Sequence, residues 1–512
     1  MCAEKEFKYK LTSDIIMVST KEFYQFIGRY QLDEALAFIS RIANKIYTKD
    51  QNFFSSGLGK EVRQNINTWQ LAFLAQSLIM RSNDHRYKIL NESEFVQCAN
   101  LYNDLESNAE AEGNSLLRIA YQQFPHQQQV KNNLGRSLYM YLDINEEVGF
   151  DKFNIDQEFK KIYDLSILDF IVIGFSLFTL ALCDQGEIYF PIENKVPGLA
   201  DYLTPEKIEK FLSITMADYK KFRNCQEREP SRPGYEKYEF NCLRKYPIIQ
   251  TEKQERLLVP IPLFLLERIT KGIFYGLRDH FNEGGKSNKF ATFFGKNIFE
   301  GYVGMLFREL YSHGLVLPEQ SYRKGNDSFD TSDWIIVENN TCILVECKTS
   351  NLTQEAKSFT DKKELLDNLK KRIIKGIKTC CRTEKDSQYI PQELSKITSF
   401  HYLIVTADDS YFCNSPFYRQ LIDPELLEMQ DLTPKYHIVS ILELENLFGY
   451  LEEVSLGELL RQKEQNPEWY EYDFREFLKD FGPKVLGKKI SWCNRLLEKK
   501  YNYFFKDILK VD

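Results

Sequence analysis

The first part of the chain repeats apolar residues at helical spacing, separated by polar connections. Trp69–Met80 is apolar nearly all round, which predicts an interior helix. No repeat of fixed period is present, which argues against a regular solenoid. We therefore predict a mainly helical N-terminal region over residues 1–240, which would serve recognition, a partner or regulation. Two of its apolar stripes consist of Phe23, Phe26, Ile27 and Tyr30, and of Ala35, Phe38, Ile39, Ile42 and Ala43.

The longest apolar run is Phe170–Cys183. It is shorter than the roughly 20 residues that a membrane-spanning helix needs. Asp169 and Asp184 stand at its two ends. We interpret it as a buried core helix, so we expect no membrane partner.

Residues 241–285 are predicted to link the helical region to the C-terminal part of the chain. Prolines disfavour helix within Tyr246–Pro262 and indicate two short extended stretches there. Ile261–Phe281 then has the pattern of a long helix.

A period-two pattern dominates Ser332–Thr349, where two runs rich in β-branched and aromatic residues flank the Asn-Asn pair at 339–340. Asn tolerates the positive φ that tight hairpin turns require, so we predict a two-residue turn. This register places Asp333 opposite Glu346 across the ladder. Lys348 lies two residues further and shares the face of Glu346. Two carboxylates and an ammonium are therefore expected to converge at one end of an apolar hairpin.

Other patterns surround this hairpin and suggest the rest of an α/β domain. They predict a mixed four- to five-stranded sheet flanked by helices over residues 286–450, followed by a helical, basic and aromatic segment over residues 451–512. The helical patterns cover Phe290–Tyr311 and Thr360–Cys381, and the strand patterns cover Phe400–Thr406 and Tyr436–Ile441.

Composition restricts the function classes. The hydrophobic content of 43% and charged content of 28% are typical of a globular protein. With a net charge of −7, no overall basic field indicates nucleic-acid binding, so such contacts would need local patches. The 11 cysteines include no CxxC pair, which argues against a zinc site. Free cysteines suit a reducing compartment and the N-terminus lacks the apolar stretch of a signal peptide, so we expect a cytoplasmic protein.

The carboxylate pair carries the candidate chemistry. Two facing carboxylates a few ångströms apart share a proton or bind a cation. Hard oxygen ligands select Mg²⁺, with Mn²⁺ as a substitute. Asp333 together with Glu346-Cys347-Lys348 resembles the PD-(D/E)xK nuclease superfamily, the restriction-endonuclease-like fold, over residues 290–450; Ser, not Pro, precedes the Asp. The resemblance implies a metal-dependent endonuclease in which Asp333, Glu346 and Lys348 are catalytic. It also implies that Asp333, Glu346 and the backbone carbonyl of Cys347 bind the metal.

A third acidic ligand is also implied by the resemblance, because a helix before the hairpin often supplies one in that family. Glu300 matches that place, at the edge of an apolar helix stripe. An ordinary, partly exposed helix Glu is an equally good interpretation. Asp330 is a second candidate for the role of Asp333 but falls outside the hairpin pairing.

Two basic segments are candidates for contact with nucleic acid, although a solvated or packed helix face is the usual meaning of such patterns. We expect nucleic acid as the partner, DNA more than RNA, and a protein partner or a second copy through the N-terminal region. Restriction or antiphage defence would suit this architecture by analogy. Two alternatives remain: a catalytically inactive binding or assembly module on the same fold, and an RNase or single-strand-specific nuclease. The basic residues are Lys362, Lys363, Lys370, Lys371, Arg372, Lys375, Lys378 and Arg382 in one segment, and Lys484, Lys488, Lys489, Arg495, Lys499, Lys500, Lys506 and Lys510 in the other.

Overall fold

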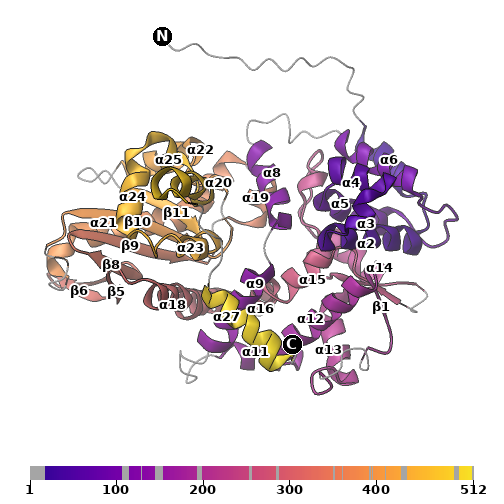
Figure 1. Cartoon of the computed structure of the whole chain (residues 1–512), viewed down its shortest axis with the longest axis horizontal. Coiled ribbons are helices and arrows are strands. Elements are labelled where there is room, and N and C mark those ends of the chain that lie inside the picture. The colour runs from indigo at the N-terminus through magenta and orange to yellow at the C-terminus, as the bar shows by residue number, and fades with distance from the viewer. Residues whose placement is uncertain are drawn as a thin grey trace, which may run out of the picture. The chain divides into compact units, whose positions relative to one another are not determined.

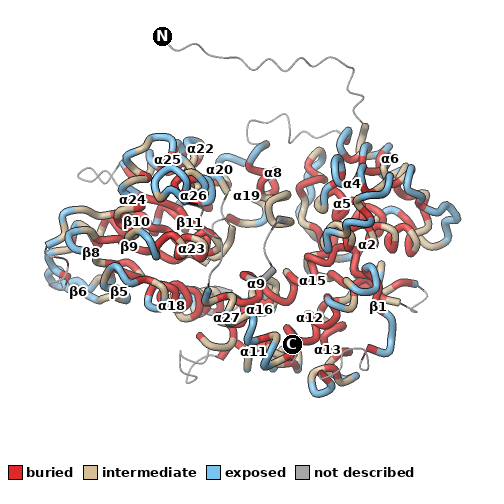
Figure 2. The backbone as a smooth tube through the Cα atoms, in the orientation of Figure 1, coloured by how far each residue is buried: buried red, intermediate tan, exposed pale blue. Residues whose placement is uncertain are grey.

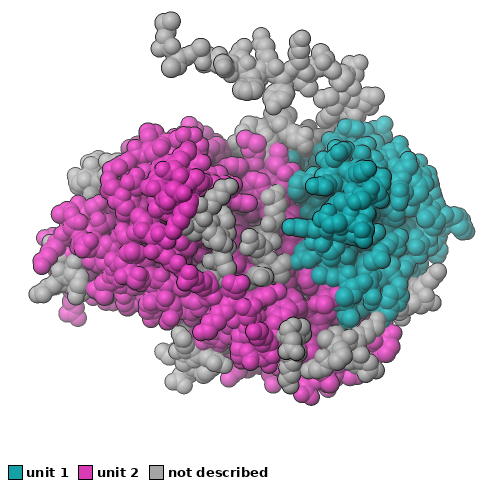
Figure 3. All heavy atoms as spheres, viewed as in Figure 1, with its two compact units in different colours: residues 1–113, 180–189, 217–262 teal, residues 114–179, 190–216, 263–512 magenta. Residues whose placement is uncertain are grey.

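The chain has a mixed α/β architecture in which small sheets are flanked by helices (Figure 1), as the sequence predicts. The structure is a computed structural model. It divides into two compact units, which Figure 3 distinguishes by colour. Unit 1 comprises residues 1–113, 180–189 and 217–262, and unit 2 comprises residues 114–179, 190–216 and 263–512. The structure describes residues 18–105, 115–127, 130–144, 154–192, 199–252, 256–283, 287–349, 352–359, 361–390, 394, 396–409, 411–427, 435–488 and 495–509.

Unit 1 is mainly helical over residues 18–105. Its helices begin at polar caps that satisfy backbone N–H groups. At α1 (Thr20–Ile27), for example, Ser19 and Glu22 form a capping box. The predicted interior helix is α5 (Thr68–Arg81), which is buried along most of its length. The other helices of this unit are α2 (Leu32–Thr48), α3 (Gln51–Ser55), α4 (Gly57–Asn65), α6 (Glu92–Asn103), α14 (Tyr219–Gln226), η3 (Glu236–Tyr238) and η4 (Cys242–Arg244).

A small four-stranded sheet completes this part of the fold, in the order β1-β4-β3-β2. β1 (Glu187–Tyr189) and β3 (Ile248–Gln250) each pair antiparallel with β4 (Arg256–Leu258). In β2 (Met216–Ala217), Met216 is assigned to unit 2 and Ala217 to unit 1. β3 and β4 are the two short extended stretches that the prolines of residues 246–262 predict.

The units interleave along the chain, whereas the sequence suggested consecutive regions over 1–240, 241–285, 286–450 and 451–512. Residues 114–179 and 190–216 belong with the C-terminal part of the chain, and residues 241–262 belong with the N-terminal part. The physical reason is that apolar periodicity marks the buried face of a helix but does not say which helix covers it.

Unit 2 is built on a five-stranded mixed sheet in the order β11-β10-β9-β8-β5. β8 pairs antiparallel with both β5 and β9, whereas β10 pairs parallel with both β9 and β11. A separate antiparallel hairpin, β6 with β7, lies between β5 and β8 in the sequence. The bounds are β5 (Leu315–Pro318), β6 (Ser321–Lys324), β7 (Asp327–Asp330), β8 (Trp334–Glu338), β9 (Thr341–Lys348), β10 (Ser399–Thr406) and β11 (Tyr436–Ser440).

Helices supply most of the remaining residues of unit 2. The Pro of α13 (Pro205–Thr215) stands at its first position and Thr204 caps it. The others are α8 (Ser115–Gln123), η1 (Phe124–Gln127), α9 (Val130–Leu138), η2 (Tyr139–Ile144), α11 (Ile155–Tyr163), α12 (Ile167–Cys183), α15 (Pro262–Arg268), α16 (Lys271–Glu283), α17 (Ser287–Phe293), η5 (Phe294–Phe299), α18 (Glu300–Leu310), α19 (Gln354–Phe359), α20 (Lys362–Leu369), η6 (Lys370–Ile374), α21 (Lys375–Lys385), η7 (Ser387–Tyr389), α22 (Pro416–Ile422), η9 (Asp423–Leu426), α23 (Ile441–Leu447), α24 (Leu456–Gln465), α25 (Pro467–Glu471), α26 (Phe474–Phe481), η10 (Gly482–Leu486), α27 (Arg495–Tyr503) and η11 (Phe504–Ile508).

The predicted core helix is α12. Most of its apolar residues are buried (Figure 2). Within the described ranges, no single helix is long and apolar enough to cross a membrane. In those same ranges α11 and α12 pass that test when taken together, and they are bent by 66° relative to each other.

The core of unit 2 lies between the sheet and the segment formed by α20, η6 and α21. Leu344 of β9 and Ile404 of β10 pack in one apolar cluster with Ile373 and Ile377 of that segment. β9 is central, because it pairs with β8 on one side and with β10 along its whole length on the other. The residues at the ends of β8 and β9 therefore have well-fixed backbones.

Candidate active site

The β8–β9 hairpin has the register that the Asn-Asn turn predicts. Five pairs run from Glu338 opposite Thr341 to Trp334 opposite Val345. Asn339 adopts a φ of 53°, the left-handed conformation that Asn tolerates. The ladder ends there, so Asp333 lies one residue beyond the last pair rather than within it.

Asp333, Glu346 and Lys348 nevertheless come together at this end of the hairpin. The Asp333 Oδ2 atom accepts a 2.6 Å hydrogen bond from the backbone N–H of Cys347. The ammonium of Lys348 donates to the Glu346 carboxylate in a short ion pair. The Glu346 side chain is only 5% exposed, whereas that of Lys348 is 21% exposed. The structure therefore brings the three predicted catalytic side chains to one end of β9, with Lys348 at the boundary to solvent.

Glu300 is the first residue of α18, directly after the π-helical segment η5. Two contacts of Trp334 fix this helix against the hairpin. The indole N–H of Trp334 donates a 3.0 Å hydrogen bond to the backbone carbonyl of Glu300. A Cβ atom on Gly304 would overlap the same indole ring, so only glycine permits this approach. Through Trp334, Glu300 is held next to the residue after Asp333.

The electrostatics of the acidic residues indicate an excess of buried negative charge. Burial, followed by repulsion from Asp333, raises the pKa of Glu346 to about 7 and that of Glu300 to about 9. Burial also raises the pKa of Asp333, although Lys348 and the Cys347 amide oppose this shift. A cation bound between these carboxylates would favour their ionised forms and lower their pKa values.

Lys348 shows the opposite balance. Burial alone would lower its pKa, but the carboxylates of Glu346 and Asp333 raise it above its usual value. Lys348 is therefore a protonated cation at neutral pH. Burial likewise raises the pKa of the Cys347 thiol, so the thiol is protonated at neutral pH and is a poor ligand. Cys347 can therefore contribute to the site through its backbone.

The donor set fits a hard divalent cation, because it consists of carboxylates whose mutual repulsion a cation would relieve. The carboxylate oxygens of Glu300, Asp333 and Glu346 do not all lie within 4.8 Å of one another, however. In the described part of the chain, the one group of three or more such side chains whose ligand atoms all lie within 4.8 Å of one another is Cys225, Glu229 and Cys242. That group offers three ligands, whereas structural zinc uses four.

Three residues beside this site were not anticipated from the sequence. Glu319, just after β5, forms a 2.9 Å ion pair with Lys296 of η5. Its charge raises the pKa values of Glu300, Asp333 and Glu346. These contacts join distant parts of the chain, so no local pattern signals them.

The third is Gly376 of α21. A Cβ atom there would come within 3.1 Å of Lys348 Cε and 3.5 Å of Glu346 Cβ. Glycine thus lets the helix approach the two residues closely. Asp330, the alternative to Asp333, lies on exposed β7, where its side chain accepts a hydrogen bond from Ser321 at 2.7 Å.

The two basic segments differ in how far acidic partners engage their lysines and arginines. In the C-terminal segment, most described lysines and arginines are engaged by acidic partners, which favours the interpretation as a packed helical region. Lys489 and Lys510 lie outside the described residues. The ion pairs are Lys484 with Asp480, Lys488 with Glu453, Arg495 with Glu452, and Lys500 with Asp143.

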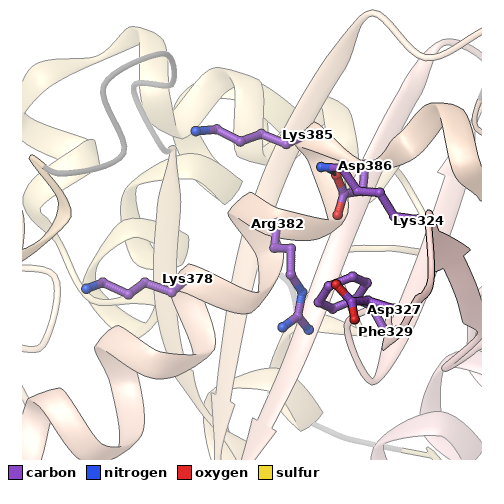
Figure 4. A pocket seen from close by; sticks show the side chains of 7 residues that line it. All are labelled: Lys324, Asp327, Phe329, Lys378, Arg382, Lys385 and Asp386. Atoms are coloured by element: carbon purple, nitrogen blue, oxygen red, sulfur yellow. Dashed lines mark hydrogen bonds and ion pairs between the residues drawn. The ribbon is translucent and has the colours of Figure 1, made fainter.

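Along α21, three of the basic residues line a surface hollow of about 560 Å³ beside the β6–β7 hairpin (Figure 4). The Arg382 guanidinium lies 5.6 Å from the centre of the Phe329 ring and donates to the Asp330 carbonyl at 2.9 Å. Lys324 pairs with Asp386 at 2.7 Å, so part of the positive charge is already compensated. Besides these residues, Asp327, Lys378 and Lys385 line the hollow.

Comparison with known proteins gives no family assignment: no protein-family model, no curated protein and no solved structure matches this chain. The site must therefore be interpreted from its own geometry.

Proposed function

We propose that the protein is a metal-dependent endonuclease of the PD-(D/E)xK type that hydrolyses phosphodiester bonds, in DNA rather than RNA. One observation carries the proposal. Asp333 and Glu346 meet at the end of a buried hairpin, with the Cys347 amide donating to Asp333 and with Lys348 bonded to Glu346. The five-stranded mixed sheet with helices on its faces supports the proposal, because the resemblance implies such a core.

Asp333, Glu346 and the backbone carbonyl of Cys347 would hold Mg²⁺, and Glu300 would complete the set. The ion would supply positive charge at the scissile phosphate and acidify a water molecule. Lys348 stays protonated, so we assign it the stabilisation of negative charge that develops on the phosphate. The pKa of about 7 for Glu346 describes the metal-free site, and a bound cation would favour its ionised form, so we assign Glu346 the role of a ligand.

The cost of burying these groups supports an active site over a decayed one. Charged groups buried without full compensation destabilise a fold. A module that only binds or assembles would have no reason to keep Asp333, Glu346 and Lys348 together. A role in restriction or antiphage defence extends this proposal by analogy with other nucleases.

Purified protein incubated with plasmid, single-stranded DNA and RNA, each with Mg²⁺ or with EDTA, tests the proposal. We expect cleavage of DNA that requires the metal. Cleavage confined to RNA or to single strands would move the protein to the alternative substrate class. The absence of metal-dependent cleavage of all three substrates would refute the nuclease function.

A further inference from the structure

A second group of charged residues lies beside the candidate active site, after the end of β10. The backbone N–H of Ala407 donates a 2.9 Å hydrogen bond to the carbonyl of Lys348. Asp408 and Asp409 come immediately after Ala407. Residues from two helices converge on this pair of acids. This second group is therefore joined to β9 through Lys348, the last residue of that strand.

Both carboxylate oxygens of Asp408 already have partners. Oδ1 accepts a 2.9 Å hydrogen bond from the Tyr275 hydroxyl of α16, and Oδ2 pairs with Lys357 of α19 at 3.1 Å. Asp409 forms a 2.8 Å ion pair with Lys271. The two acids hold two lysines and a tyrosine in place, and their contacts are largely shielded from water.

Arg372 is a third cation whose charge interacts with Asp408, the acid that pairs with Lys357. Its pKa is lowered by burial and, in part, by Arg278, while Asp408 acts against the shift. Its Nη1 atom is shielded from solvent and has no hydrogen-bond partner in the described part of the chain. A buried guanidinium N–H without an acceptor is costly, and an incoming anion would relieve that cost.

The position of Arg372 also relates it to the catalytic centre. It lies in η6, a π-helical turn, and such turns occur frequently at functional sites. Gly376, which abuts Lys348, lies four residues later, about one helical turn along the same segment. Arg372 is thus about one helical turn away from Gly376, the residue that abuts Lys348.

We propose that Arg372, Lys357 and Lys271 form a phosphate subsite that holds a nucleic-acid phosphate next to the one that is cleaved. The inference rests on the proposed nuclease function and adds a substrate contact to it. Arg372 supplies a planar fork of donors suited to phosphate oxygens, and the lysines supply point charges. Asp408 and Asp409 keep the lysines in position when no substrate is bound.

Arg372→Gln tests the subsite in a salt titration of DNA binding, carried out in EDTA so that no cleavage occurs. Loss of one phosphate contact should weaken binding about tenfold at moderate salt. It should also reduce the slope of log K against log salt by about 0.9 for duplex DNA. The matched control is Arg461→Gln, an exposed arginine that pairs with Glu458, and it should keep the wild-type slope. Because the Nη1 donor is unsatisfied, Arg372→Gln should not lower the melting temperature.

The outcomes separate the two proposals. If the wild-type protein cleaves DNA and Arg372→Gln keeps the wild-type affinity and slope, the subsite is wrong and the nuclease function stands. Equal loss in Arg461→Gln, or a marked fall in the melting temperature of Arg372→Gln, would also overturn the subsite. If Arg372→Gln does not fold, Lys357→Gln is tested in the same salt titration. An unchanged salt slope in Lys357→Gln would also overturn the subsite. Wild-type protein that neither binds nor cleaves DNA would remove both proposals.

Discussion

Replacing Glu346 with Gln should stabilise the metal-free protein at alkaline pH. The folded-state pKa of Glu346 is raised from 4.5 to about 7. An acid with a raised folded pKa destabilises the fold when ionised, and this penalty disappears as the pH falls toward the unfolded value. At 1.36 kcal/mol per pKa unit, the penalty is about 3 kcal/mol at pH 8 and about 1 kcal/mol at pH 5. Gln resembles the protonated acid and should recover most of the difference.

Thermal melting in EDTA at pH 5 and pH 8 measures this effect. The melting temperature of Glu346→Gln should exceed that of the wild type by several degrees at pH 8, and the gap should narrow at pH 5. Added Mg²⁺ should reverse the order, because the cation stabilises only the ionised carboxylate. Glu309→Gln, which changes an exposed acid of α18, should leave the melting curve unchanged. Identical curves for Glu346→Gln and the wild type at both pH values would refute the electrostatic reasoning.

Three further substitutions test other residues of the site. Glu300→Gln should reduce cleavage strongly without lowering the melting temperature, since Gln resembles the protonated form that burial favours, whereas Glu309→Gln should do little; equal small effects on cleavage would make Glu300 an ordinary helix residue. Lys348→Ala should lower the cleavage rate on the order of 10²–10³-fold while a mobility-shift titration still detects DNA binding, and a wild-type rate would exclude a catalytic role. Gly376→Ala should push the Lys348 side chain aside and lower the rate at unchanged substrate affinity, and full activity would mean that the close approach is unimportant.

Much of the hairpin was predictable because its determinants are local. The Asn-Asn turn and the period-two pattern fix the register, which in turn brings Asp333, Glu346 and Lys348 together. Pairing alone would have placed Asp333 in the ladder. Its carboxylate instead bonds the Cys347 amide just beyond the last pair, a detail that depends on where the ladder ends.

The contacts that tune the site were not predictable from sequence. Glu319 and Lys296 meet through the packing of η5 against the end of β5, and neither belongs to a motif. Arg372 resembles any other residue of a lysine-rich helix face, yet it lies in a π-helical segment and its Nη1 atom is shielded from solvent. The interleaving of the two units has the same origin, because chain order does not determine which segments pack together.

The rate of DNA cleavage by Asp333→Asn, compared with that of Asp330→Asn, tests the central claim most directly. Both substitutions remove one negative charge and are three residues apart, but only Asp333 faces the Cys347 amide and the buried carboxylates. We predict that Asp333→Asn loses cleavage in Mg²⁺, with partial recovery in Mn²⁺, and that Asp330→Asn cleaves at the wild-type rate. Full activity of Asp333→Asn, or equal loss in both variants, would contradict the assignment of the active site.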